Sequence, residues 1–305
     1  EQMVMSVRTL LGRRPNVLTE APEVTRLLEL PGPILSSGAF EHLLNQNPRH
    51  FPNIVLRPVW PVQSGSQALE QCLELICDEA EQAVRHGANI VVLYDGDVNP
   101  FRAPIPSLLV TSAVHHRLVA TGLRLSASIG VASGEPREVH HFACLLGYGA
   151  DAIYPYLALE TIQDIREAGE DSQLNFIRAV EKGLLKIMAK MGISLLSSYR
   201  AGQVFEILGL DQQLGERYFP NTPSVLGGAR LEEIARDIST WHQQAYECES
   251  PSKLSSYGFY KYKKDGEAHR FAPAVVKAMH HMVQAGSQAL KSQANPFEVF
   301  ADLPE

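Results

Sequence analysis

The chain of 305 residues is 45% hydrophobic and has a formal net charge of -7, so it can bury a large core without disulfide or metal support. This acidic balance disfavours binding to nucleic acid or to an anionic membrane, and it leaves small molecules or other proteins as the expected partners. No apolar run approaches the roughly 18 residues of a membrane span, and residues 1–7 lack the basic start of a signal peptide, so we expect a soluble protein of the cytoplasm, or of the plastid in a photosynthetic eukaryote.

The first residues are polar and helix-like, and the chain starts on Glu1 rather than on a methionine, which indicates a segment of a longer protein. From about residue 33, short apolar or β-branched runs alternate with longer helical patterns, which is typical of βα units around a mostly parallel sheet. We expect an α/β fold whose sheet is either incomplete or similar to a TIM barrel. The expected strands are residues 34–36, 54–58, 90–94, 125–131, 152–156 and 193–198.

The helices between these strands have apolar residues at the spacing of one helical face. One is expected at residues 67–86 and ends at Gly87, where glycine suits the C-terminal stop. A second carries Glu135 in its first turn and ends at Gly147. A third, at residues 176–191, has an apolar inner stripe and a basic second face that we expect to contact solvent or a partner; this face is formed by Lys182, Lys186 and Lys190.

Beyond about residue 240 the alternation stops, and a polar, turn-rich stretch with a cluster of lysines follows. We therefore expect a domain boundary near residue 240, and a less regular C-terminal extension that contains one helix at residues 273–282. The four cysteines are too few and too scattered for a disulfide scaffold, and we interpret them as reduced, buried thiols. They are Cys72, Cys77, Cys144 and Cys248.

Polar residues follow several of the expected strands at their carboxyl ends, where ligands bind in parallel sheets. An acid, hydroxyl groups and an arginine on one rim could form a site for a small polar ligand, although loop ends are polar in any soluble protein. The candidate rim or interface residues are Asp95, Asp97, Ser133, Glu135, Tyr154, Tyr156, Ser198, Tyr199 and Arg200.

Two pairs of adjacent histidines, at residues 115–116 and 140–141, raise the question of a metal site. Adjacent helical residues point about 100° apart and cannot both bind one ion, so we interpret these histidines as helix-face residues bonded to the backbone or to neighbouring acids. The sequence contains no Gly-x-Gly-x-x-Gly after a strand, no Walker loop and no Gly-x-Ser-x-Gly elbow. We expect no catalytic, cofactor-binding or metal-binding residues in this chain.

Three separated blocks resemble the central domain of the glutamate synthase large subunit. The longest is REVHHFACLLGYGADAIYPYLA at residues 137–158. The second combines KGLLK at 182–186, MGIS at 191–194, SYR at 198–200 and FE at 205–206, and the third combines TPS at 222–224 with LEEIA at 231–235. The chain departs from the family pattern at residues 201–202 (Ala-Gly rather than Gly-Ala), at Ala132 rather than an acid, and at residues 95–97 (Asp-Gly-Asp rather than a Ser-Asp-Arg-like turn).

The resemblance implies three parts: a linker from an absent glutaminase domain at residues 1–29, the central domain at 30–240, and the start of the FMN synthase region at 241–305. It also implies a non-catalytic domain that connects the glutaminase domain with the FMN and iron–sulfur synthase domain and supports ammonia transfer. The parent enzyme forms glutamate from glutamine and 2-oxoglutarate, and its FMN and iron–sulfur cluster lie outside this chain.

Two hypotheses of different classes follow. In the first, the chain is inactive alone and self-associates through faces that its partner domains would cover. In the second, it is an autonomous βα enzyme or small-anion-binding domain that uses the strand-end rim, with Glu135 or Asp95 as general base and Arg200 holding the anion.

Overall fold

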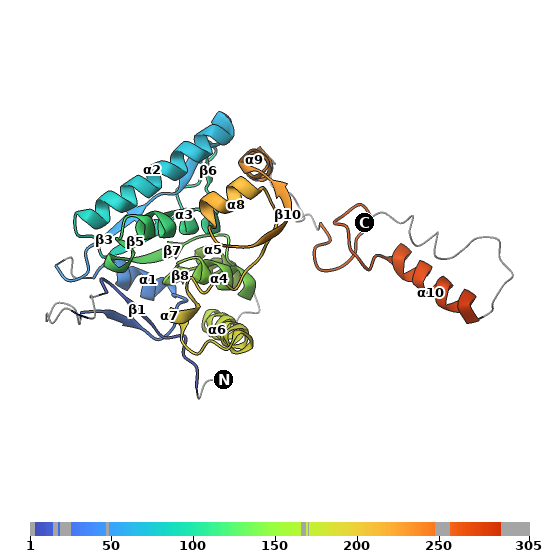
Figure 1. Cartoon of the computed structure of the whole chain (residues 1–305), viewed down its shortest axis with the longest axis horizontal. Coiled ribbons are helices and arrows are strands. Elements are labelled where there is room, and N and C mark those ends of the chain that lie inside the picture. The colour runs from blue at the N-terminus through green and yellow to red at the C-terminus, as the bar shows by residue number, and fades with distance from the viewer. Residues whose placement is uncertain are drawn as a thin grey trace. The chain divides into compact units, whose positions relative to one another are not determined.

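The computed structural model describes residues 4–14, 18, 26–46, 49–165, 169, 171–247 and 257–287. The chain divides into two compact units, Glu1–Glu247 and Cys248–Glu305 (Figure 1). The first unit carries nearly all of the regular structure.

The strands of the first unit are β1 (Thr9–Leu11), β2 (Leu28–Leu30), β3 (Asn53–Leu56), β4 (Val59–Pro61), β5 (Ile90–Tyr94), β6 (Arg102–Pro104), β7 (Ser128–Ala132), β8 (Ala152–Tyr154), β9 (Ile207–Leu210) and β10 (Ser224–Ala229). Its helices are α1 (Ser37–Leu44), α2 (Gly65–Arg85), α3 (Ser107–Ala120), α4 (Val139–Gly147), α5 (Tyr156–Asp164), α6 (Ser172–Met191), α7 (Leu196–Tyr199), α8 (Gln212–Tyr218) and α9 (Leu231–Glu247).

The centre of this unit is a parallel sheet with the strand order β3-β5-β7-β8. A single parallel bridge between Ile34 and Ile153 adds the segment before α1 beyond β8. The expected α/β class with a parallel sheet is therefore confirmed. Within the described residues, β3 pairs with β5 on one side only, so the sheet is open and corresponds to the incomplete alternative.

Both faces of the sheet are covered, as parallel sheets require. In β5, Val91 and Leu93 belong to the larger core, which α2, α3 and α4 cover, while Ile90 and Val92 belong to a smaller core beneath α1 and the β1–β2 hairpin (Figure 1). The period-two alternation of a strand thus explains why β5 is apolar throughout.

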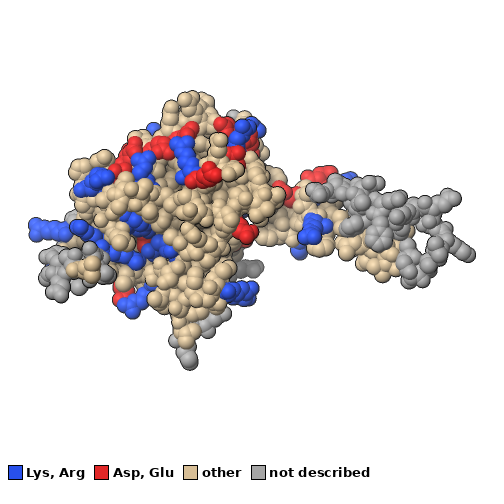
Figure 2. Space-filling model, in the orientation of Figure 1, with Lys and Arg blue, Asp and Glu red and all other residues tan. Residues whose placement is uncertain are grey.

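Helix α2 confirms the helix expected at residues 67–86, and its apolar stripe is buried. Its polar side is paired with arginines of neighbouring helices: Arg117 of α3 lies 2.7 Å from Glu74, and Arg217 of α8 lies 3.0 Å from the same carboxylate. Figure 2 shows the acidic and basic side chains gathered on this side of the molecule. These ion pairs are partly exposed, so each contributes at most about 1 kcal/mol.

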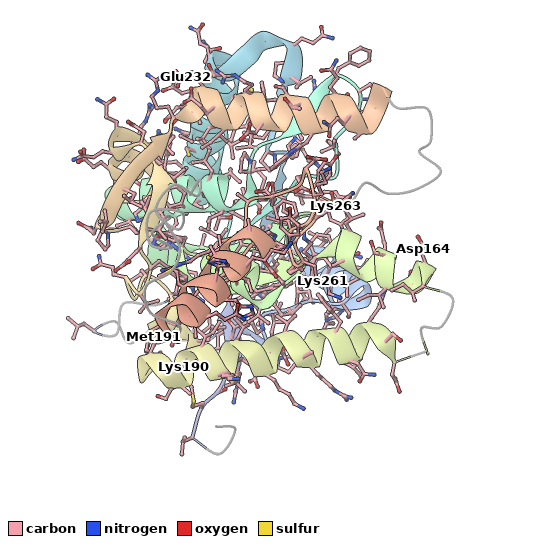
Figure 3. All side chains as sticks on the ribbon, turned by 90° about the vertical axis from the view of Figure 1, so that its right-hand side faces the viewer. Asp164, Lys190, Met191, Glu232, Lys261 and Lys263 are labelled. Carbon is pink, nitrogen blue, oxygen red and sulfur yellow. The ribbon has the colours of Figure 1, made fainter. Side chains whose placement is uncertain are left out.

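Helix α6 likewise confirms the third expected helix and starts four residues earlier, at Ser172. Its lysines at 182, 186 and 190 are exposed, as expected for its basic face. Gly192 ends the helix in the left-handed conformation, with φ 71°, that glycine adopts without strain. Lys190 and Met191 are labelled at this end in Figure 3.

The prediction of a strand at residues 193–198 is wrong. Only Leu195 forms a bridge, with Ser6, and the chain then turns into the short helix α7. The physical reason is the spacing of Leu196 and Tyr199, which lie one helical turn apart and are both buried. The strand expected at residues 34–36 is reduced to the bridge at Ile34.

Part of the segment expected as a linker belongs to the first unit. Within residues 1–29, β1 pairs with β2 and Leu11 is buried, so part of this segment is built into the first unit. Helix α9 continues through residue 240, and the compact unit ends at Glu247. The assignment of the three segments to parts of a larger enzyme stays a prediction.

The sequence patterns missed the parallel pair β9–β10, which lies at one side of the first unit beside α8 and α9 (Figure 1). In the second unit, residues 257–271 form turns and bends and precede helix α10 (Pro273–Ser287), which confirms the helix expected at 273–282. Residues 248–256, which include Cys248, lie outside the described residues.

Cys72, Cys77 and Cys144 are free thiols, and the first two lie in α2 as expected. Burial raises the pKa of Cys77 to about 12, which makes it an unreactive thiol at neutral pH. Among the described residues, no helix is long and apolar enough to cross a membrane.

Candidate functional site

The carboxyl edge of the sheet holds a cluster of polar side chains around Asp95, which follows β5 directly. The hydroxyl groups of Ser133 and Tyr156 donate to the two oxygens of its carboxylate over 2.5 and 2.7 Å, and the Gly134 N–H donates over 3.3 Å. Because β5, β7 and β8 are parallel neighbours, the residues that follow them meet at one point. Asp95, Ser133 and Tyr156 therefore lie together at this edge, and their role as a ligand site stays a prediction.

Burial raises the pKa of Asp95, and the hydrogen bonds from Ser133 and Tyr156 oppose this rise. The pKa of Tyr156 is raised as well, by burial and by the neighbouring Asp95 carboxylate. The tyrosine therefore stays protonated and acts as a donor. With three donors directed at it, the Asp95 carboxylate holds the loops after three strands together.

Two further candidates lie near this edge with partners of their own. The Glu135 carboxylate accepts hydrogen bonds from the backbone N–H and the hydroxyl of Ser107, over 2.7 and 2.5 Å. The Tyr154 hydroxyl donates to Ser37 over 3.1 Å. These bonds connect the start of α3 and the start of α1 with the sheet.

The remaining candidates are not part of the cluster. Asp97 is exposed and forms a solvent-accessible ion pair with Arg57, in which its carboxylate oxygen lies 3.6 Å from Nε. Ser198 is exposed on α7. Tyr199 is buried, and within the described structure its hydroxyl has no hydrogen-bond partner.

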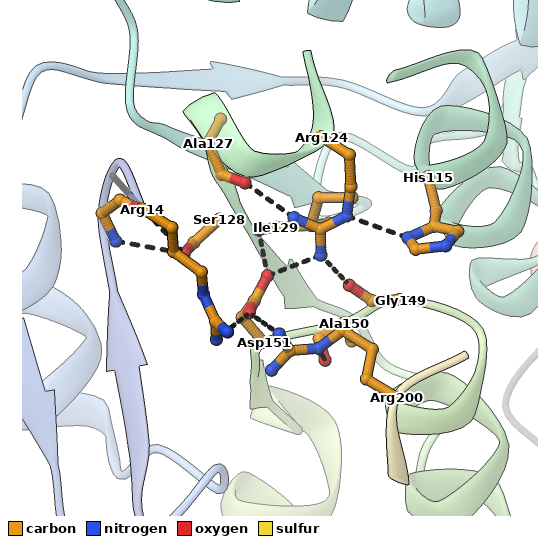
Figure 4. A network of polar contacts seen from close by, with 11 residues as sticks. Arg14, His115, Arg124, Ala127, Ser128, Ile129, Gly149, Ala150, Asp151 and Arg200 are labelled. Carbon is orange, nitrogen blue, oxygen red and sulfur yellow. Dashed lines mark hydrogen bonds and ion pairs between the residues drawn. The ribbon is translucent and has the colours of Figure 1, made fainter. Parts of the chain in front are cut away.

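Arg200 lies at the opposite, amino edge of the sheet, where it joins a network around Asp151 (Figure 4). Its Nη1 lies 2.6 Å from the Asp151 carboxylate, and its Nε donates to the carbonyl of Ala150 over 3.3 Å. Arg124 donates to the other carboxylate oxygen over 2.8 Å, and Arg14 lies 4.0 Å away. Arg200, predicted to lie on the same rim as Asp95, is therefore separated from it by the length of the strands.

Asp151 is fully buried directly before β8, and its carboxylate also accepts the backbone N–H of Ile129 over 2.8 Å. Burial alone would raise the pKa of this carboxyl, but the guanidinium groups of Arg200 and Arg124 outweigh it and hold the pKa below its usual value. The sequence reasoning missed this network. The sequence contained one signal for it, an aspartate immediately before an apolar strand. A charged side chain buried at such a position requires a partner of opposite charge.

The arrangement of the rim restricts its chemistry. A site for a small anion needs a cation beside the acid and hydroxyl groups, and among the described residues the arginine predicted for that role lies at the other edge of the sheet. At the carboxyl edge, Asp95 and Glu135 are both acidic and both already accept hydrogen bonds. Among the described residues, no group of three or more histidine, cysteine or acidic side chains is arranged to hold a metal ion.

Comparison with known proteins gives a consistent result over the whole chain. The ferredoxin-dependent glutamate synthase of rice chloroplasts is 38% identical over 332 residues, which cover 100% of this chain and 20% of the relative. The large chain of the NADPH glutamate synthase of Azospirillum brasilense is 37% identical over 290 residues, which cover 93% of this chain and 19% of the relative. The chain thus spans about one fifth of the length of these relatives.

Among solved structures, a flavocytochrome b2 variant with sulfite bound covers 55% of this chain and 38% of its own, with 17% sequence identity and a TM-score of 0.36, a likeness too weak to specify function. A family model described as Glutamate synthase central domain matches residues 1–211, which is more than half of the chain. The chain therefore belongs to the glutamate synthase central domain family.

Proposed function

We propose that this chain is a non-catalytic connecting domain of a glutamate synthase large chain, inactive alone, between a glutaminase domain and an FMN and iron–sulfur synthase domain. In this role it supports the transfer of ammonia from glutamine to 2-oxoglutarate. The cofactors belong to the synthase domain. The location follows that of the parent enzyme, in the cytoplasm or in a plastid.

The observation that carries this proposal is the exposed ribbon β9–β10. Its apolar side chains point into solvent: Leu208 is 69% exposed, Val225 76% and Leu226 61%. Parallel strands are normally buried on both faces. This pair contacts α8 and α9, and Ile207 of β9 belongs to the core, but the described residues of the first unit leave its other apolar side chains uncovered.

The rest of the large chain is the source of that cover. The relatives are about five times as long as this chain, so most of each of them lies outside the matched region. A neighbouring domain of the same polypeptide is present at high effective concentration, which favours even a modest apolar contact. Interdomain contacts of this kind fix the orientation of two domains when they are sufficiently apolar.

The alternative of an autonomous enzyme at the rim has less support. Its general base would be Asp95 or Glu135 and its anion holder Arg200, and these groups lie at opposite edges of the sheet. A small anion would meet two carboxylates at the carboxyl edge without the predicted cation.

The experiment introduces Leu226→Asp into the full-length large chain, so that a charge is placed in the apolar contact. We expect the glutaminase and synthase half-reactions, assayed separately, to keep their rates within about twofold, while the glutamine hydrolysed per glutamate formed rises. The matched control is Leu75→Asp on α2, because Leu75 is also exposed, at 55%. An unchanged ratio in Leu226→Asp would contradict the connecting role of this surface.

A further inference from the structure

The amino edge of the sheet carries more positive than negative charge around Asp151. Arg14, Arg124 and Arg200 all reach this one carboxylate, and Figure 4 shows their side chains converging on it. One carboxylate balances one guanidinium group, so two positive charges remain. The side chains of Arg124 and Arg200 are only 13% and 10% exposed. Cations held at such depth are costly unless an anion lies beside each of them.

Arg124 uses its donors within the protein. Its Nε–H donates to His115, its Nη1 donates to the carbonyl of Ala127, and its Nη2 donates to the carbonyl of Gly149 and to Asp151. These bonds fix the guanidinium group in place. The contribution of Arg124 to any further ligand is therefore its charge.

Arg200 keeps donors that the protein does not use. Its Nε donates to the carbonyl of Ala150, and its Nη1 lies 2.6 Å from Oδ1 of Asp151. Within the described structure this buried Oδ1 receives no hydrogen bond, so the contact with Arg200 is one of charge and not of an aligned N–H group. The two Nη groups of Arg200 are left without an acceptor among the described residues.

The balance of charge on Arg200 points the same way. Burial lowers the pKa of this guanidinium group, and the Asp151 carboxylate opposes the fall. The neighbouring charges of Arg124 and Arg14 add to it, and the pKa ends below its usual value. A single aspartate thus leaves the charged form of Arg200 incompletely compensated.

Arg14 is placed beside this pair by its backbone. Its N–H donates to the carbonyl of Leu125 over 2.7 Å, and the N–H of Gly12 donates to the hydroxyl of Ser128 over 3.0 Å. Both bonds tie the segment after β1 to the segment that leads into β7 and to its first residue. The guanidinium group of Arg14 is consequently held at the amino edge of the sheet.

The side chain of Arg14 offers free donors on the solvent side of the network. It is 33% exposed, and its Nη2 lies 4.0 Å from the same Oδ1 of Asp151 that Arg200 contacts. That distance is too long for a hydrogen bond, and in the described structure the guanidinium group makes none. Arg14 and Arg200 therefore bring unused N–H groups to one carboxylate oxygen.

A small oxyanion has the chemistry that this arrangement lacks. A guanidinium group presents its N–H donors in a planar fork that matches two oxygens of a carboxylate or a phosphate. An anion between Arg14 and Arg200 would accept from both groups and supply the missing negative charge. A cation would be repelled by the same surplus.

We propose that Arg14 and Arg200 form a binding site for one small oxyanion at the amino edge of the sheet. The site lies at the opposite edge from the cluster around Asp95, and it is built entirely from residues of the first unit. It does not depend on the connecting role proposed above.

The test measures the melting temperature of the 305-residue chain at constant ionic strength while sodium chloride is exchanged for sodium phosphate. A second series uses sodium 2-oxoglutarate. We expect a rise of roughly 2–4 °C that saturates with the concentration of the anion. General exclusion of salts from the protein surface gives a rise that does not saturate. A saturating effect of phosphate alone assigns a phosphate, one of 2-oxoglutarate alone a carboxylate, and one of both a general oxyanion site.

The variants remove one side of the site. Arg14→Gln should abolish the saturating part of the rise, whereas Arg13→Gln, the matched control, makes the same change of charge at the exposed neighbouring residue and should retain it. Arg200 is left unchanged because its loss would also break the buried pair with Asp151.

A second measurement needs no variant. In the unmodified chain labelled with nitrogen-15, the Nε–H signals of Arg14 and Arg200 should shift along the same saturation curve. If neither anion produces a saturating rise, or if Arg14→Gln responds as strongly as the unmodified chain, the proposal is overturned. Unshifted Nε–H signals of both arginines would overturn it as well.

Discussion

Arg200 and Asp151 form a buried ion pair in which Nη1 and the carboxylate oxygen are 2.6 Å apart. Arg200 follows α7, and Asp151 precedes β8, so the pair fastens the segment after α7 to the amino edge of the central sheet. Arg124 binds the same carboxylate from the segment before β7. One aspartate therefore joins three separate parts of the chain.

Replacing this aspartate should destabilise the fold strongly. In Asp151→Asn the side chain keeps its shape but leaves the buried guanidinium groups of Arg124 and Arg200 without a counter-charge. Removing one partner of a buried pair costs about 3–5 kcal/mol, and we expect that loss in the free energy of unfolding measured by urea denaturation. The matched control is Asp97→Asn, which removes an exposed pair and should change the same quantity by less than about 1 kcal/mol. Equal effects would contradict the role of the network.

The same pair predicts a pH dependence. The pKa of Asp151 is lower in the folded protein than its usual value of 3.8. Its stabilising contribution is therefore fully present above the usual value and is lost as the pH falls towards the folded pKa. The difference in unfolding free energy between the unmodified chain and Asp151→Asn should be constant near neutral pH and shrink below about pH 4. A difference that grows on acidification would contradict this assignment.

The parts of the sheet that local pattern dictates were predicted well. Strand β5, at Ile90–Tyr94, coincides with the expected range because it is a continuous apolar run bounded by polar residues. The error at residues 193–198 had a local cause, since two apolar residues one helical turn apart made a short helix that resembled a strand in sequence. That error also misplaced Arg200, because the residue after a strand was assumed to lie at the carboxyl edge.

The Asp151 network and the contacts of His115 could not be read from the sequence in the same way. His116 indeed bonds to the backbone, as expected for a helix-face histidine. However, the ring of His115 accepts a hydrogen bond from Arg124, which the tertiary structure brings beside it from the segment before β7. Such contacts are set by the tertiary structure and leave no periodic signal.

A glycine beside His115 gives a third prediction. Gly149 has φ 119°, and a Cβ at this position would lie 2.4 Å from Nδ1 of His115. Gly149→Ala should therefore lower the free energy of unfolding by roughly 1–3 kcal/mol and displace the His115 ring from Arg124. Gly122→Ala is the matched control, since φ is also positive there but nothing lies within 4 Å of the added Cβ. An undisturbed His115 nitrogen spectrum in Gly149→Ala would contradict this packing.

The exposed ribbon gives a fourth prediction. Without its neighbouring domains, the isolated chain should self-associate as its concentration rises, because apolar surface is removed from water. Light scattering should show this mass increase, and Leu226→Asp should reduce it. Leu75→Asp should leave it unchanged. A strictly monomeric chain at high concentration would count against an apolar docking face at β9–β10.

A connecting domain would carry no redox site of its own, and one measurement tests this most directly. The purified chain is incubated with excess FMN, desalted, and examined by absorption spectroscopy and for glutamate formation from ammonia and 2-oxoglutarate with a chemical reductant. The connecting role predicts a colourless and inactive protein. Retained flavin absorbance with glutamate formation would show a catalytic site within this chain and contradict the connecting role.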